Sequence, residues 1–111
     1  MTTPEGKVKD KIKKFMKDLF PASWSYMPVQ SGYGAHGIPD HIYSVPIVIT
    51  EEMVGETVGI FVGIEAKTMD GKMSKYQRVQ RDAITDSSGF YVTIYGVGDI
   101  EDKLGVLRKL L

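Results

Sequence analysis

The sequence predicts an α/β protein in which a mixed central sheet is flanked by helices. Three patterns predict this fold class: apolar residues at helical spacing over residues 4–19, β-branched runs in the middle of the chain, and a helix, strand and helix over residues 75–111. A chain of 111 residues is long enough for one hydrophobic core but too short for two, so we expect a single domain over residues 1–111.

The first predicted element is an amphipathic helix over residues 4–19. Thr3 can cap its first turn, Pro4 suits the first helical position, and Pro21 ends it. Its apolar stripe consists of Val8, Ile12, Phe15, Met16 and Leu19. Glu5 shares the face of this stripe. It therefore either faces the protein, where a carboxylate needs a partner, or lies in solvent in a frayed first turn.

Short strands are predicted next. Residues 24–30 resemble a strand, and the glycine-rich segment 31–37 is expected to be a flexible turn, because its spacing matches neither a Walker loop nor a dinucleotide-binding loop. Two β-rich runs follow, 38–50 and 57–67, and an acidic turn joins them. The simplest connection between such runs is an antiparallel hairpin.

The last third of the chain predicts a helix, a strand and a final helix. Ser74 can cap a helix over residues 75–87 that ends near Gly89, and a strand over residues 90–95 can then pair in parallel with an earlier one. Asp99 is the expected cap of the final helix, whose apolar face carries Leu104, Leu107 and Leu111. The predicted order is αβββαβα.

Composition limits the function classes. Hydrophobic content of 42% and charged content of 25% are typical of a globular protein, which argues against disorder. We expect an intracellular, cytoplasmic protein without a membrane partner, because no apolar run reaches about 20 residues and the N-terminus lacks the core of a signal peptide. Without cysteine, any metal must be held by oxygen or imidazole ligands, which favours Mg²⁺ or Mn²⁺.

Charge is distributed unevenly, although the formal net charge is zero. The first helix carries a cluster of lysines: Lys7, Lys9, Lys11, Lys13, Lys14 and Lys17. A surface polarised in this way can meet a polyanion such as DNA, although a solvated lysine face is equally common.

Two carboxylates and a lysine form the candidate active site. Alternation along the run 57–67 places Glu65 and Lys67 on one face, about 7 Å apart along the strand. The run is otherwise apolar on both faces, which predicts a central strand covered on both sides. If the two β-rich runs pair, Asp40 approaches Glu65. His41 lies on the opposite face from Asp40, so it and His36 are weaker candidates for metal or proton chemistry.

Clustered carboxylates repel one another, so such a cluster usually holds a cation. Mg²⁺ takes one or two carboxylates, keeps several waters and accepts phosphate oxygens. Lys67 could then orient the attacking water or offset the charge of a pentavalent phosphorus. The alternative is an ordinary surface salt bridge between Lys67 and either acid.

Three short motifs occur in one order: Gly37-Ile38-Pro39-Asp40, Glu65-Ala66-Lys67 and Ser74-Lys75-Tyr76-Gln77. Together they resemble the VRR-NUC family of the PD-(D/E)xK nuclease superfamily. The resemblance implies a restriction-endonuclease-like αβββαβ core. It also implies that Asp40, Glu65 and the Ala66 carbonyl bind the metal, with Glu5 contributing from the first helix. Lys67 and Gln77 would assist catalysis. Gln80 shares the helix face of Gln77, and only the family match favours Gln77.

The resemblance also implies a function. Stand-alone members look like phage-type endonucleases that depend on Mg²⁺ or Mn²⁺ and cut branched DNA such as Holliday junctions. Symmetric cutting needs two active sites, so we expect a homodimer in a bacterial or phage-infected cell, with Lys9, Lys13 and Lys17 contacting DNA. The alternatives are a flap or replication-fork nuclease, an inactive DNA-binding accessory protein, and a protein-interaction module.

Overall fold

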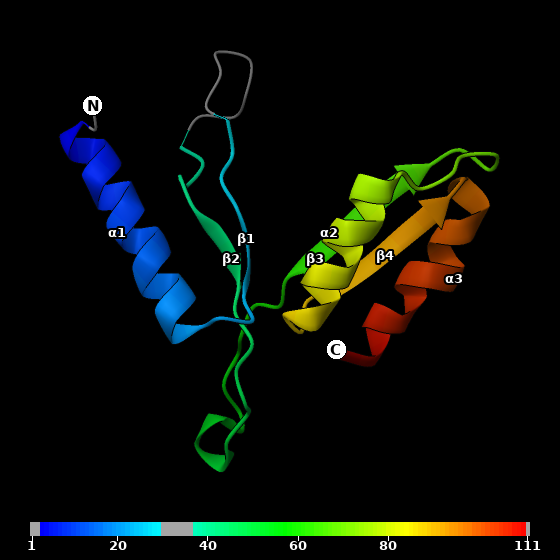
Figure 1. Ribbon diagram of the computed structural model, residues 1–111. Helices are drawn as coiled ribbons and strands as arrows, with labels where there is room; N and C mark the ends of the chain where they lie inside the picture. The colour runs from blue at the N-terminus through cyan, green and yellow to red at the C-terminus, as the bar shows by residue number, and fades with distance from the viewer. Residues whose placement is uncertain (1–2, 30–36, 111) are drawn as a thin grey trace.

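The computed structural model describes residues 3–29 and 37–110, which form a mixed α/β protein (Figure 1). Its helices and strands are, in order, α1 (Pro4–Leu19), β1 (Trp24–Tyr26), β2 (Ile42–Ser44), β3 (Val62–Lys67), α2 (Lys75–Asp86), β4 (Phe90–Tyr95) and α3 (Ile100–Leu104). Three short 3₁₀ helices are η1 (Glu51–Met53), η2 (Val97–Asp99) and η3 (Gly105–Leu110). The predicted order αβββαβα is confirmed. The predicted glycine-rich turn lies outside the described residues except for Gly37.

Helix α1 begins and ends as its sequence predicts, but its apolar stripe is not packed. The Thr3 hydroxyl accepts a hydrogen bond from the Gly6 amide at 3.0 Å, and Pro4 occupies the first turn. The stripe was expected to face a core, yet Phe15 is 63% exposed and Val8, Ile12 and Leu19 are also exposed. Helical periodicity therefore predicted the helix correctly and its burial wrongly, because burial depends on partners distant in sequence.

The strands form two separate two-stranded sheets within the described residues. Strands β1 and β2 pair antiparallel, and β3 and β4 pair in parallel with Glu65 opposite Thr93. The single mixed sheet and the hairpin between the runs 38–50 and 57–67 are therefore not observed. Pro46 offers a physical reason, since it follows β2 closely and has no amide to donate to a ladder.

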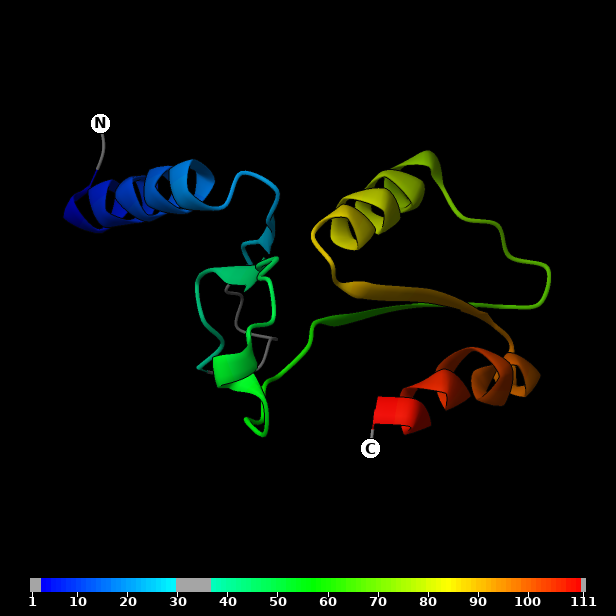
Figure 2. The ribbon, with the colours of Figure 1, turned by 90° about the horizontal axis from the view of Figure 1, so that it is seen from below.

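Helix α2 lies on one side of the parallel sheet, and α3 lies on the other side, where it packs against β4 (Figure 2). Ile84 of α2 and Val92 and Ile94 of β4 are the buried apolar residues of this half. Asp99 occupies the N-cap position of α3, as predicted, but its side chain makes no capping hydrogen bond, because its carboxylate accepts from the Tyr95 amide at 3.0 Å. In the described ranges, no helix is both long and apolar enough to cross a membrane.

The two sheets meet at one apex. Ser44, at the end of β2, and Ser87, just after α2, are both buried, and their hydroxyl oxygens lie 2.8 Å apart. A side chain at Gly89 would approach the Ser44 hydroxyl to 3.0 Å, so this glycine permits the close approach of β2. At the same apex Trp24 packs on Phe61, with ring centroids 4.9 Å apart.

From this apex the two halves diverge (Figure 1). The radius of gyration is 17.0 Å, whereas a compact domain of this length has one of about 13 Å. Residues 45–61 leave β2, turn at η1 and return to β3, and Ile47, Val48 and Ile49 of this segment are exposed. The N-terminal half therefore shares few contacts with the half that carries the parallel sheet.

Candidate functional site

Three of the predicted site residues come together where β3 faces α2. The Gln77 side-chain nitrogen donates a hydrogen bond of 2.6 Å to Glu65 Oε1. The Lys67 ammonium nitrogen lies 3.7 Å from the same oxygen. We call Glu65, Lys67 and Gln77 the Glu65 cluster.

Strand alternation places Glu65 and Lys67 on the same face of β3, as predicted. Gly63 lies two residues earlier on that face, where an added side chain would come 3.2 Å from the Tyr91 ring. Apolar packing therefore occupies the first part of the face, and the polar pair lies at its end. The opposite face of β3 was predicted to be covered, but Ile64 is 53% exposed, because α3 packs against β4 rather than β3.

The N-terminus of α2 fixes the orientation of the Gln77 amide. Its side-chain oxygen accepts from the Ser74 amide at 2.8 Å, while the Ser74 hydroxyl accepts from the Gln77 amide at 3.1 Å. This capping box directs the Gln77 NH₂ group to Glu65. Turning the amide over would break both of its side-chain hydrogen bonds, so the network itself assigns the orientation.

The cluster is partly shielded from water. The side chains of Glu65 and Lys67 are 32% and 21% exposed. A hollow of about 330 Å³ adjoins Glu65 and Gln77, and its other lining residues include Trp24, Phe61, Tyr76 and Tyr91. Glu65 therefore lies in the wall of a hollow that is partly aromatic.

Gln80 has a different role from Gln77. Its side-chain oxygen accepts a hydrogen bond of 2.8 Å from the Trp24 indole nitrogen, which links α2 to β1. The sequence left these two glutamines unranked by geometry, and the structure shows that Gln77 is the one that contacts Glu65. The Trp24 contact was not predicted, and the only signal for it was that Gln80 shares a helix face with Gln77.

Asp40 does not join the Glu65 cluster in this chain. It is exposed and precedes β2, in the sheet that diverges from β3. Across residues 3–29 and 37–110 there is no group of three or more His, Asp or Glu side chains that could hold a metal ion. The prediction that Asp40 approaches Glu65 depended on pairing of the two β-rich runs, and that pairing is not observed.

Glu5 is also separate from the cluster. Its side chain is 77% exposed and lies 3.8 Å from the Lys9 ammonium nitrogen, one helical turn away. Of the two positions that the sequence left open for Glu5, the structure shows the solvent-facing one. The remaining predicted DNA contacts, Lys13 and Lys17, line a hollow beside β1 and β2.

The oxygen atoms of Glu65 and Ala66 supply only part of the ligands that Mg²⁺ or Mn²⁺ needs. Glu65 supplies one carboxylate, and Ala66, predicted to offer its carbonyl, lies next to it in β3 opposite Ile94. Mg²⁺ prefers several oxygen ligands, commonly one or two carboxylates with waters.

His41 lies beside β2, in the other sheet from the Glu65 cluster. Both ring nitrogens of His41 are buried without a hydrogen-bond partner in the described residues, and the ring lies 6.4 Å from that of Tyr43. His36 lies outside the described residues.

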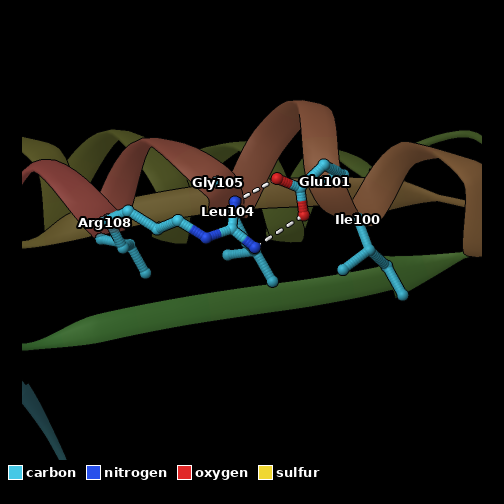
Figure 3. Close-up of a pocket in the computed structure, with 6 residues that line it drawn as sticks. Ile100, Glu101, Leu104, Gly105 and Arg108 are labelled. Atoms are coloured by element: carbon cyan, nitrogen blue, oxygen red, sulfur yellow. Dashed lines mark hydrogen bonds and ion pairs between the residues drawn. The ribbon is translucent and has the colours of Figure 1, made fainter.

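A second hollow, of about 300 Å³, lies along α3 and η3 (Figure 3). Arg108 forms a two-pronged ion pair with Glu101 across it, and this hydrogen bonding raises the pKa of Arg108 above its ordinary value. None of the predicted site residues lines this hollow, which makes the Glu65 cluster the better candidate site.

The fold and the site define a mixed α/β protein with a carboxylate, lysine and amide cluster at the end of a strand. Comparisons of the chain with protein-family models, with curated proteins and with solved structures find no match.

Proposed function

We propose that this protein is a nuclease of the VRR-NUC type that hydrolyses phosphodiester bonds in DNA with the help of Mg²⁺ or Mn²⁺. The observation that carries the proposal is the convergence of Glu65, Lys67 and Gln77 at the end of β3. These residues come from two of the three motifs that resemble the family. The finer fold that we propose is the restriction-endonuclease-like αβββαβ core, with Asp40 completing the site.

The chain's own residues suit this chemistry. Gln77 holds the Glu65 carboxylate in one orientation, so that its second oxygen remains available to a cation. A bound divalent ion would polarise the phosphoryl group and acidify a water molecule. Lys67 places a positive charge beside Glu65, where it can offset charge that develops on a phosphate.

Branched DNA is the proposed substrate. Tyr76 is 82% exposed and lines the same hollow as Glu65, so its ring can stack on an unpaired base at a junction. Lysines along α1 can contact the phosphates of a neighbouring arm. A four-way junction has two equivalent strands to cut, which calls for a homodimer.

The rivals are a flap or replication-fork nuclease and a DNA-binding protein without activity. Both would use the same basic and aromatic surfaces. The presence of Asp40, Glu65 and Lys67 favours an active enzyme.

A cleavage assay tests this proposal. Labelled four-way junction, flap and matched duplex are incubated with the protein and Mg²⁺, Mn²⁺ or EDTA. We expect metal-dependent cleavage, fastest on the junction, that Asp40→Asn and Lys67→Ala abolish. Lys109→Ala is the matched control, because Lys109 lies on η3 at the far end of the chain. Cleavage that neither site variant affects would exclude this site, and metal-independent binding without cleavage would favour the accessory protein.

A further inference from the structure

We propose that two copies of this chain exchange their N-terminal halves, so that Asp40 of one copy lies beside Glu65, Lys67 and Gln77 of the other. The role of the composite site rests on the proposed function. The exchange itself rests on surfaces that the described residues leave uncovered.

Unpaired sheet edges are the first such surface. Within the described residues, β2 pairs only with β1 and β3 pairs only with β4. Two-stranded sheets are marginal on their own, and free edges invite a further strand. Placing β2 of one copy against β3 of the other gives the strand order β1, β2, β3, β4. With β2 antiparallel to β3, that order would bring the residues preceding β2 toward the polar end of β3.

Apolar faces without a partner are the second. The stripe of α1 lines a hollow of about 360 Å³ formed by Val8, Lys11, Ile12, Phe15 and Met16. The face of β3 that carries Ile64 is also open. An amphipathic helix and an open sheet face are complementary surfaces, and the exchange supplies one to the other.

Contacts at the apex keep β2 from pairing with β3 of the same chain. Trp24 of β1 packs on Phe61 and donates a hydrogen bond to Gln80 of α2, so β1 lies beside α2. Buried Ser44 and Ser87 hold the end of β2 at the same place. The residue before Pro46 favours an extended backbone, which suits residues 45–61 as a connector between halves that belong to different units.

A second copy fits these surfaces better than an unrelated protein, because this chain carries both members of each complementary pair. The free edge of β2 can pair with the free edge of β3, and the apolar stripe of α1 can cover the open face of β3. Its net charge of zero also means that two copies do not repel each other strongly.

Mixing two inactive variants tests the exchange. Asp40→Asn and Glu65→Gln chains carrying different tags are co-expressed, and the mixed species is isolated. If each site takes Asp40 from one copy and Glu65 from the other, one site of the mixed dimer contains both substitutions and the other site contains neither. We expect each variant alone to be inactive and the mixed species to nick the junction at about half the wild-type rate. A mixed species as inactive as its parents would overturn the exchange.

A second readout does not depend on activity. Light scattering should give twice the chain mass of 12.4 kDa, and Phe15→Asp should shift the protein to a monomer. The matched control is Lys14→Asp, on the other side of α1, which should stay dimeric. Wild-type protein that is monomeric at every concentration would overturn the exchange. Dimeric protein with no cleavage would instead retain the dimer and reject the proposed function.

Discussion

The Gln77 side chain joins Glu65 of β3 to the N-terminus of α2. One end of its amide accepts from the Ser74 amide, and the other end donates to Glu65 at 2.6 Å. A single residue therefore closes the first turn of a helix and orients the candidate catalytic carboxylate.

Replacing Gln77 with glutamate separates these two tasks. Glutamate also completes a capping box, so we expect helix α2 to persist by circular dichroism. Its carboxylate would face that of Glu65, and repulsion between the two charges should lower the free energy of unfolding at neutral pH relative to wild type. Cleavage should be lost. Exposed Val79→Ala on the same helix is the control. A free energy of unfolding equal to that of wild type at neutral pH would contradict the Glu65 contact.

Trp24→Phe keeps an aromatic ring against Phe61 and removes the hydrogen bond to Gln80. We expect the free energy of unfolding to fall by about 1 kcal/mol, the usual scale for one such bond. Thermal or denaturant unfolding followed by circular dichroism measures it. Tyr26→Phe should change stability by less than about 0.5 kcal/mol. Equal effects of the two substitutions would mean that the Trp24 bond does not stabilise the apex.

The buried Ser44 and Ser87 hydroxyls should be energetically coupled. Each substitution to alanine leaves the other hydroxyl without this partner, so a double-mutant cycle should give a coupling free energy of about 1 kcal/mol. The same cycle between Ser44 and the distant Ser74 should be additive. If the effects on the free energy of unfolding were additive for both pairs, the contact between Ser44 and Ser87 would contribute nothing to stability.

DNA binding by α1 should depend steeply on salt. Replacing Lys9, Lys13 and Lys17 should reduce the slope of log affinity against log salt by about one unit for each phosphate contact removed. Lys9 also lies near Glu5, so it should contribute less than the other two. Replacing Lys103 and Lys109 is the control, measured by fluorescence anisotropy. An unchanged slope in the α1 variant would place the DNA surface elsewhere.

Local signals in the sequence predicted the order of the elements and the starts of the first two helices. The strands predicted over residues 24–30, 38–50 and 57–67 were too long, because the regular pairing that defines β1, β2 and β3 covers only part of each run. Thr3, Pro4 and Ser74 mark the starts of α1 and α2 correctly, because capping depends on residues within one turn. Alternation likewise placed Glu65 and Lys67 on one face of β3. Strand pairing depends on contacts between distant residues, and for that reason the hairpin between the runs 38–50 and 57–67 was predicted wrongly.

The difference between local signals and contacts between distant residues also explains which site residues were predicted correctly. Glu65 and Lys67 follow from a single strand, and the resemblance to a family favoured Gln77, which lies within reach across one crossover. The positions of Asp40 and Glu5 depended on where the first helix and β2 pack. Neither packing could be derived from periodicity, because an apolar stripe indicates that a face needs covering without indicating what covers it.

The most direct measurement is the rate at which wild-type protein and Glu65→Gln cut a four-way junction in Mg²⁺. The substitution keeps the shape of the side chain and its contact with Gln77 while removing the charge. We predict cleavage that falls by roughly 100-fold or more, the scale of one electrostatic catalytic group, with the free energy of unfolding nearly unchanged. Equal rates for the two proteins, or no cleavage by wild type on any branched DNA, would contradict a nuclease site at Glu65.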